Sequence, residues 1–214
     1  MLDDNGKKVW VLIVNLNPGG PNGGSSTQYF LGDFDGKTFT SSHTDTRWMD
    51  YGPDNYAGIT WSNTGSRKIL IGWMSNWMYA NLVPTETWRN ATTIPRDLKL
   101  KHIGNDIFLA SKPVPELSVI HSKPIISNNV LVKKSMDLAI KTGKIKLPCR
   151  ININLEKIKD FSLVVSNDAG EETVIGFDKK QNQYFIDRTK SGKTDFQKDF
   201  AARHIAPQIG RAHV

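Results

Sequence analysis

Short apolar runs separated by turn residues make up the first half of the chain. Residues 7–16 (KKVWVLIVNL) are rich in β-branched side chains and too short for a stable helix, and residues 26–34 (STQYFLGDF) form a second such run. We predict that the two runs pair as a hairpin across the glycine-rich stretch between them. Asp35-Gly36 is a tight-turn dipeptide, which predicts a third strand over residues 37–42.

The same pattern continues to about residue 111. Further strands are expected around the turn sequences NTGS and IGND, at residues 56–63, 67–75 and 106–111. Strands at this spacing, with no amphipathic helix among them, predict an antiparallel all-β architecture: a sandwich, a barrel or a propeller.

A proline-rich stretch, residues 111–124 (SKPVPELSVIHSKP), interrupts the strands, because proline cannot donate a ladder hydrogen bond. All six tryptophans precede it, so the two halves differ in character. Beyond it, apolar and polar positions alternate again in a way that fits a β-sandwich with one solvated face. Strands are expected there at residues 128–142, 149–157, 160–167, 172–180 and 183–189.

These patterns divide the chain into four segments. The last six residues (IGRAHV) match one reading frame of a common sequencing adapter, so we expect the protein itself to end at Gln208. The expected segments are a first β domain over residues 1–112, a linker over 113–124, a partial sandwich over 125–208 and an adapter-derived tail over 209–214.

The charge of the chain narrows the class of partner. The net charge is +7, but residues 1–110 hold ten Lys and Arg against ten Asp and Glu, so the excess lies in the second half. The lysines there are scattered, without an arginine cluster or interleaved aromatic side chains, which argues against a nucleic-acid partner. No stretch approaches the roughly 20 consecutive apolar residues of a membrane helix, so no membrane partner is expected either.

The sequence gives no support for metal, cofactor or triad chemistry. Its single cysteine, Cys149, excludes an internal disulfide and a cysteine metal cluster. The five histidines lack metal-ligand spacing, and no local motif assembles a Ser-His-Asp triad. The glycines of GGPNGG lack the lysine and the strand-to-helix setting of a phosphate loop. We therefore expect neither a metal nor a cofactor.

Two aromatic stretches are candidates for sugar recognition. In residues 48–57 (WMDYGPDNYA), Asp50 stands beside aromatic side chains on a glycine and proline turn, and carboxylates accept paired sugar hydroxyls while rings stack on sugar faces. In residues 71–81 (IGWMSNWMYAN), Trp73 and Trp77 share one face of a strand by period two. The alternatives are that Asp50 caps a turn and that the aromatic side chains fill the core.

Read in order, four blocks of the sequence closely resemble glycoside hydrolase family 32, the invertases, inulinases and levanases. The resemblance keeps order and spacing across about residues 7–207, and it implies the last blades of a five-bladed β-propeller followed by part of a β-sandwich. The blocks are VWVLIVNLNPGGPNGGSSTQYFLGDFDGKTF, WMDYGPDNYAGITWSN, ILIGWMSNWMYANLVPTETWRNATTIPRDL and DFQKDFAARHIAP.

The resemblance also implies a reaction. The family hydrolyses terminal β-D-fructofuranosyl bonds with retention, using an aspartate nucleophile and a glutamate acid/base. Their motifs, and the Arg-Asp-Pro motif of a third carboxylate, are absent from the sequence, and by resemblance they belong upstream of residue 1. No catalytic residue is therefore assigned. We expect a fragment of a retaining β-fructosidase that is inactive alone, because losing a catalytic pair costs several orders of magnitude in rate.

Several residues match family positions that face substrate. The resemblance implies that Asp50 and Tyr51 line the funnel of the propeller and that Trp73 faces the fructosyl site. The glycine loop resembles one at the propeller mouth, where Asn22 is expected to contact the leaving group. Further substrate-binding candidates are Asp54, Asn76 and Trp77.

The expected partner is sucrose or a fructan such as inulin or levan, and the residues neither choose among these substrates nor indicate an oligomeric state. The parent protein is expected to be secreted or periplasmic, as fructan-degrading members of the family usually are. The alternative from another class is a non-catalytic carbohydrate-binding β module that keeps Asp50 and Trp73 without the chemistry.

Overall fold

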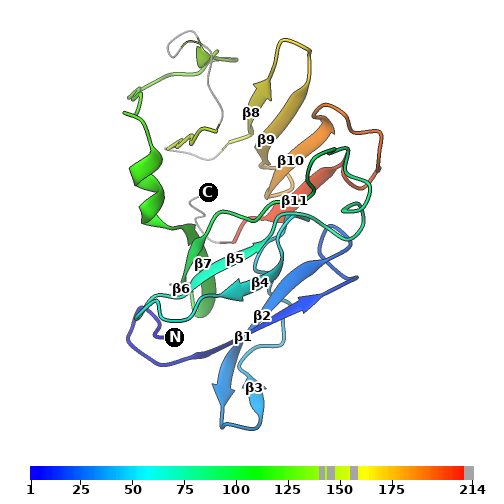
Figure 1. The fold of residues 1–214 in the computed structure, drawn as a ribbon. Helices are drawn as coiled ribbons and strands as arrows, with labels where there is room; N and C mark the ends of the chain where they lie inside the picture. The colour runs from blue at the N-terminus through cyan, green and yellow to red at the C-terminus, as the bar shows by residue number, and fades with distance from the viewer. Residues whose placement is uncertain (140–142, 144–147, 155–158, 210–214) are drawn as a thin grey trace. The chain divides into compact units, whose positions relative to one another are not determined.

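The computed structural model describes residues 1–139, 143, 148–154 and 159–209 (Figure 1). The chain divides into two compact units, Met1–Val114 with Lys159–Val214, and Pro115–Ile158. The sheets of the described residues all lie in the first unit. The predicted all-β fold is confirmed, and the number of propeller blades stays a prediction.

The glycine-rich stretch joins the first two strands of a three-stranded antiparallel sheet. Its strands are β1 (Trp10–Leu16), β2 (Ser26–Phe34) and β3 (Phe39–Ser41), in that spatial order. The predicted hairpin and third strand are therefore confirmed. The Asp35 carboxylate accepts hydrogen bonds from the backbone amides of Lys37 and Thr38, both at 2.7 Å, and so forms the predicted turn.

The second sheet has four antiparallel strands in the order β4-β5-β6-β7. They are β4 (Tyr56–Thr60), β5 (Ile69–Trp73), β6 (Arg96–Ile103) and β7 (Asp106–Pro113). β6 was not among the predicted strands. It pairs with β7 along its whole length across a turn at Gly104, whose φ of +62° suits glycine.

Alternate side chains of these two sheets form one hydrophobic core. Strands that place every second residue inward explain why Leu98 and Leu100 of β6 are buried while Lys99 between them is exposed. Tyr29 is anchored as well, because its hydroxyl accepts a hydrogen bond of 3.2 Å from the Leu109 amide. The buried members of the core are Val9, Tyr29, Leu31, Leu70, Leu98, Leu100 and Leu109.

The third sheet has the order β11-β10-β9-β8. Its strands are β8 (Phe161–Ser166), β9 (Glu172–Asp178), β10 (Gln183–Lys190) and β11 (Arg203–Pro207). The first three agree with the predicted strands at residues 160–167, 172–180 and 183–189. β11 was not predicted, because five residues carry little periodicity and this strand is defined by its pairing with β10.

The second unit differs from the sequence prediction. The expected linker contains a short 3-10 helix, η1 (Pro115–Ile120). Strands were expected at residues 128–142 and 149–157, but the described residues there form none. The residues outside the described part are 140–142, 144–147, 155–158 and, in the expected tail, 210–214. A strand needs a partner for its backbone groups, and none pairs with these described segments.

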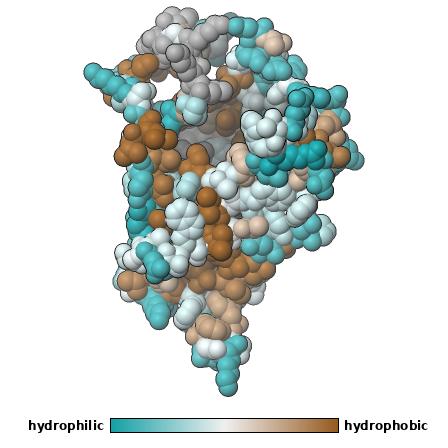
Figure 2. All heavy atoms as spheres, viewed as in Figure 1, coloured by the Kyte–Doolittle hydropathy of each residue, from teal (hydrophilic) through white to brown (hydrophobic). Residues whose placement is uncertain are grey.

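Large apolar side chains remain exposed on the edge strands of the first two sheets. Trp10 and Leu12 of β1 are 43% and 41% exposed, and Ile59 of β4 is 64% exposed. Figure 2 shows hydrophobic surface in the lower half of the view, where these strands lie in Figure 1. Such edges favour association with further apolar surface. Among the described residues, no helix has the length and apolar character needed to cross a membrane.

Candidate functional site

Six of the seven predicted site residues lie on three segments next to strand ends, and the seventh, Trp73, is the last residue of β5. The three segments are the glycine loop between β1 and β2 (residues 17–25), the segment before β4 (residues 48–55) and the turn after β5 (residues 74–80). Side-chain hydrogen bonds connect the three segments, and a ring contact joins Trp77 to Trp73. The structure therefore brings the seven predicted residues into one region of the first unit.

Asn76 holds the three segments together. Its side chain is fully buried, and its Oδ1 accepts hydrogen bonds from the amides of Ser25 (3.2 Å) and Met78 (3.0 Å). Its Nδ2 donates to the carbonyls of Ser25 (3.2 Å) and Pro53 (2.9 Å). A fully buried amide with this many backbone partners shapes the site through the loops that it connects.

Asp50 caps a turn, as one of the two sequence interpretations proposed. Its Oδ1 accepts a 2.7 Å hydrogen bond from the Gly52 amide, and its Oδ2 accepts a 3.2 Å bond from Nδ2 of Asn55. The Asp50 carboxylate also interacts with the charge of Arg96. Burial lowers the pKa of Arg96, and the negative charge of Asp50 opposes that shift. Each carboxylate oxygen has a second lone pair, so capping leaves Asp50 able to accept a sugar hydroxyl.

Three aromatic rings form a cluster at the end of β5. The ring centroids of Trp73 and Trp77 are 4.9 Å apart at 58°, and Tyr56 lies 6.3 Å from Trp73 at 56°. Trp73 is half-buried, whereas Trp77 is 53% exposed. The cluster is thus partly packed and partly open to solvent, and an open indole can stack against the apolar face of a sugar.

The side chain of Asn22 forms hydrogen bonds with the backbone of two residues. Its Nδ2 donates to the Tyr51 carbonyl at 2.5 Å and to the Ile205 carbonyl at 3.0 Å, and its Oδ1 accepts the Ile205 amide at 3.1 Å. The glycine loop is thereby attached both to the Asp50 segment and to β11. Contact of Asn22 with a leaving group stays a prediction.

Asp54 belongs to a half-buried polar cluster. One of its oxygens accepts the Tyr79 hydroxyl, and the other forms a 2.5 Å ion pair with Nη1 of Arg188 from β10. Burial first, and then the negative charge of Asp54, raise the pKa of Tyr79, so the phenol remains a hydrogen-bond donor. Contact of Asp54 with substrate also stays a prediction.

Three contributors were missed by the sequence analysis. Asn55 is buried and orients Asp50, while Tyr79 and Arg188 hold Asp54. Asn55 stood within the quoted aromatic stretch, and its proximity to Asp50 was the available signal. Arg188 is 134 positions from Asp54, and no local pattern links positions so far apart.

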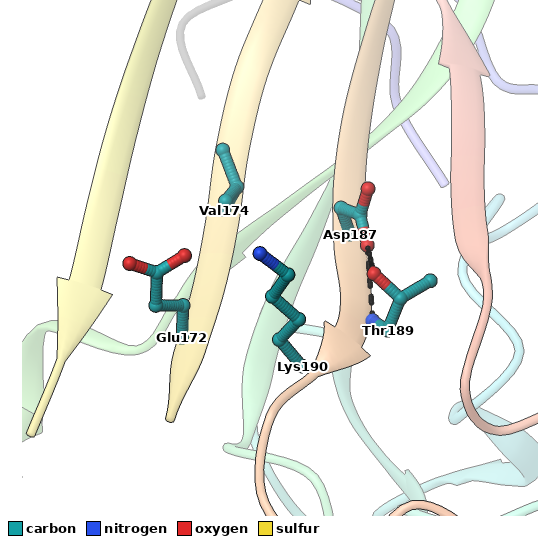
Figure 3. Close-up of a pocket in the computed structure, with 5 residues that line it drawn as sticks. All are labelled: Glu172, Val174, Asp187, Thr189 and Lys190. Carbon is teal, nitrogen blue, oxygen red and sulfur yellow. Dashed lines mark hydrogen bonds between the residues drawn. The ribbon is translucent and has the colours of Figure 1, made fainter. Parts of the chain in front are cut away.

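A separate small cavity of about 180 Å³ lies on the third sheet (Figure 3). Its lining comes from β9 and β10, and none of the predicted site residues takes part. Asp187 is already engaged, because it accepts hydrogen bonds from the Thr189 amide (2.9 Å) and hydroxyl (2.7 Å). We assign no ligand to this cavity. The lining residues are Glu172, Val174, Asp187, Thr189 and Lys190.

In the part of the chain that the structure describes, no cluster of three or more His, Cys, Asp or Glu is placed to hold a metal ion.

Comparisons with known proteins match both halves of the chain to a family. The sequence profile of the "Glycosyl hydrolases family 32 N-terminal domain" matches residues 1–113. The profile of the "Glycosyl hydrolases family 32 C terminal" matches residues 116–210. Together they cover the candidate site and the third sheet.

Curated relatives and solved structures give the same result. A levanase of Bacillus subtilis is 36% identical over 210 residues (94% of this chain, 31% of the levanase). The extracellular exo-inulinase inuE of Aspergillus niger is 37% identical over 225 residues (97% and 41%). The crystal structure of the exo-inulinase from Aspergillus awamori superposes with a TM-score of 0.70 at 30% identity, covering 99% of this chain and 44% of that one. The chain thus spans less than half the length of these relatives.

Proposed function

This chain belongs to glycoside hydrolase family 32, and from that premise we propose that its three connected loops form the sugar-binding wall of a retaining β-fructosidase. The substrate class is a terminal β-D-fructofuranosyl unit of sucrose, inulin or levan. We also propose that the protein is exported, since the relatives include an extracellular exo-inulinase. The direct sugar contacts are assigned to Asp50, Trp73 and Trp77, with Tyr51 beside them.

The observation that carries the proposal is the open aromatic cluster beside an oriented carboxylate. Asn55 joins the two parts, because its amide binds Asp50 while its Oδ1 packs on Gly72, where an added Cβ would lie only 2.4 Å away. Gly72 precedes Trp73 directly. We expect this packing to hold the Trp73 ring and the Asp50 carboxylate at a fixed separation. The ring would then stack on a furanose while the carboxylate accepts its hydroxyls.

Tryptophan fluorescence provides the binding test. Titration of the 214-residue chain with fructose and with short inulin oligosaccharides is expected to give a saturable change, with a weaker response to glucose. Trp77→Ala should weaken binding about five- to tenfold, the equivalent of the roughly 1 kcal/mol of an aromatic stacking contact. The matched control is Trp61→Ala, since Trp61 is also half exposed (50%) but lies outside the cluster. Equal losses in the two variants, or no response of the unmodified chain to fructosides, would refute the proposed wall.

Hydrolysis is tested on the enzyme that carries this chain. Fructose release from sucrose, inulin and levan should fall in Asp50→Asn and Trp73→Ala, and proton NMR of the first product should show the retained β anomer. An inverted anomer would contradict the proposed mechanism. Saturable sub-millimolar binding, without hydrolysis by the enzyme that carries this chain, would favour the carbohydrate-binding module instead.

A further inference from the structure

The third sheet, together with the loop that joins β10 to β11, is attached to each of the three site segments. Asn22 of the glycine loop bonds to the backbone of Ile205 in β11, and Asp54 pairs with Arg188 in β10. At the turn after β5, the Met78 carbonyl accepts a 3.2 Å hydrogen bond from Nε2 of Gln197. The contacts are polar and directional, which distinguishes them from generic packing between sheets.

Arg188 contacts the side chains of two site segments, Asp54 and Tyr79. Its Nη1 pairs with Asp54, its Nη2 donates to the Tyr79 hydroxyl at 3.3 Å, and its guanidinium lies 4.1 Å from the ring centroid of Phe200. The side chain is only 15% exposed. A planar guanidinium can satisfy two partners at fixed angles, which a lysine ammonium does not reproduce.

His204 completes the cluster in its neutral form. Nη2 of Arg188 lies 3.1 Å from Nε2 of His204, and arginine can only donate, so Nε2 must be the acceptor. His204 is 7% exposed, and its ring also bonds to the backbone of Phe200. Protonation would put a proton on Nε2 and end the hydrogen bond to Arg188.

We propose that Arg188 and His204 of the third sheet are positioning residues for the sugar-binding wall, and that protonation of His204 releases this hold. Arg188 fixes Asp54 and, through Tyr79, the turn that carries Asn76 and Trp77. The claim that these residues position a sugar-binding wall rests on the proposed function. The attachment of the third sheet to the three site segments does not depend on that function.

The charges around His204 set the direction of the pH effect. Burial first, and the positive charge of Arg188 second, lower the pKa of His204; the Phe200 backbone and the carboxylates of Asp54 and Asp187 act in the opposite direction. A histidine with a lowered pKa takes up its proton more readily in the unfolded chain. The stabilisation that neutral His204 gives to the folded chain is therefore complete above the unfolded-state pKa of about 6.5. This stabilisation is lost as pH falls from there towards the folded-state pKa.

Hydrogen exchange of the full chain tests the positioning role without any sugar. Arg188→Met keeps the aliphatic stem and removes the guanidinium. It should reduce protection of the Ser25, Gly52 and Met78 amides about 10- to 100-fold, the range for loss of a hydrogen bond to a charged group. Amides of the β1–β2 hairpin should keep their protection. Unchanged protection at all three amides would overturn the proposal.

The matched control is Arg203→Met. Arg203 also lies on an aromatic ring (3.7 Å from the centroid of Phe185) and near a carboxylate (3.9 Å from Asp178), within the third sheet itself. This variant should leave the three amides unchanged. If Arg188→Met fails to fold, Arg188→Lys keeps the charge and should still lower protection, and full protection in Arg188→Lys would equally overturn the proposal.

The pH profile tests His204. Exchange protection of the same amides in the unmodified chain should fall between pH 7 and pH 5, and His204→Gln, whose amide oxygen still accepts from Arg188, should flatten that dependence. A profile that His204→Gln leaves unchanged would contradict the role of His204. Fructoside titration of the same proteins is the second measurement. If fructoside binding is lost together with exchange protection, both the sugar-binding wall and the positioning role are supported. If protection changes but the unmodified chain binds no fructoside, the positioning role stands and only the sugar-binding wall is refuted.

Discussion

Asn76→Ala is expected to lower the free energy of unfolding by roughly 3–5 kcal/mol, because it leaves several buried backbone groups without partners and each such group costs about 1–3 kcal/mol. The groups affected are the amides of Ser25 and Met78 and the carbonyls of Ser25 and Pro53. Removal of the amide cannot be compensated by water unless the loops open, since the side chain has no exposed surface.

Urea unfolding followed by circular dichroism measures this effect. Asn167→Ala is the matched control, because Asn167 also accepts two backbone amides, those of Ala169 (3.0 Å) and Glu171 (3.1 Å), but in an exposed turn. Water replaces those bonds, so the expected loss is at most about 1 kcal/mol. A loss for Asn76→Ala no greater than that for Asn167→Ala would show that the buried network does not stabilise the fold.

Gly24→Ala should destabilise the chain by about 3 kcal/mol, far more than the same change at Gly65. Both glycines have a φ of +63°, so the backbone strain of adding a Cβ is the same, about 1 kcal/mol. At Gly24 the new Cβ would lie 2.1 Å from Oδ1 of Asn76 and 2.7 Å from Cγ of Met78, whereas nothing lies within 4 Å at Gly65. The difference between the two variants isolates the steric clash.

Unfolding of the two glycine variants by urea gives the comparison, and a double variant sharpens it. Because Asn76→Ala removes the atom that clashes, the combined effect of Gly24→Ala and Asn76→Ala should be smaller than the sum of the single effects by about 1–2 kcal/mol. Equal losses at Gly24 and Gly65, or strict additivity in the double variant, would be incompatible with the close approach of the glycine loop to Asn76.

Strand prediction succeeded where the local pattern sufficed. β2 and β5 combine β-branched or aromatic runs with flanking turn residues, and the Asp35-Gly36 turn fixes its own geometry through the Asp35 carboxylate. β6 was missed although its leucines alternate with lysines, which is the pattern of a half-buried strand. β11 escaped notice because five residues become a strand only when β10 supplies the partner.

The sequence named the candidate residues, whose contact with sugar stays a prediction, but it did not show how their side chains are connected. Resemblance and composition selected Asp50, Trp73 and Trp77 as candidates, because a carboxylate and indole rings have the chemistry that sugar recognition needs. The sequence did not show that Asn76 faces inward, since a polar residue beside an exposed tryptophan is read equally well as a surface group. Nor did it show that Asp54 pairs with Arg188, because that contact depends on how the third sheet docks.

The bond between Asn22 and Ile205 joins positions 183 residues apart. During synthesis on the ribosome, the glycine loop cannot form these two hydrogen bonds to Ile205 until β11 has followed. Contacts of such long sequence separation form late, since the entropy of the intervening chain must be overcome first. Ribosome-bound nascent chains that stop before β11 should therefore carry a folded β1–β2 hairpin with a loosely held glycine loop, and this loop should be the last of the three site segments to become fixed.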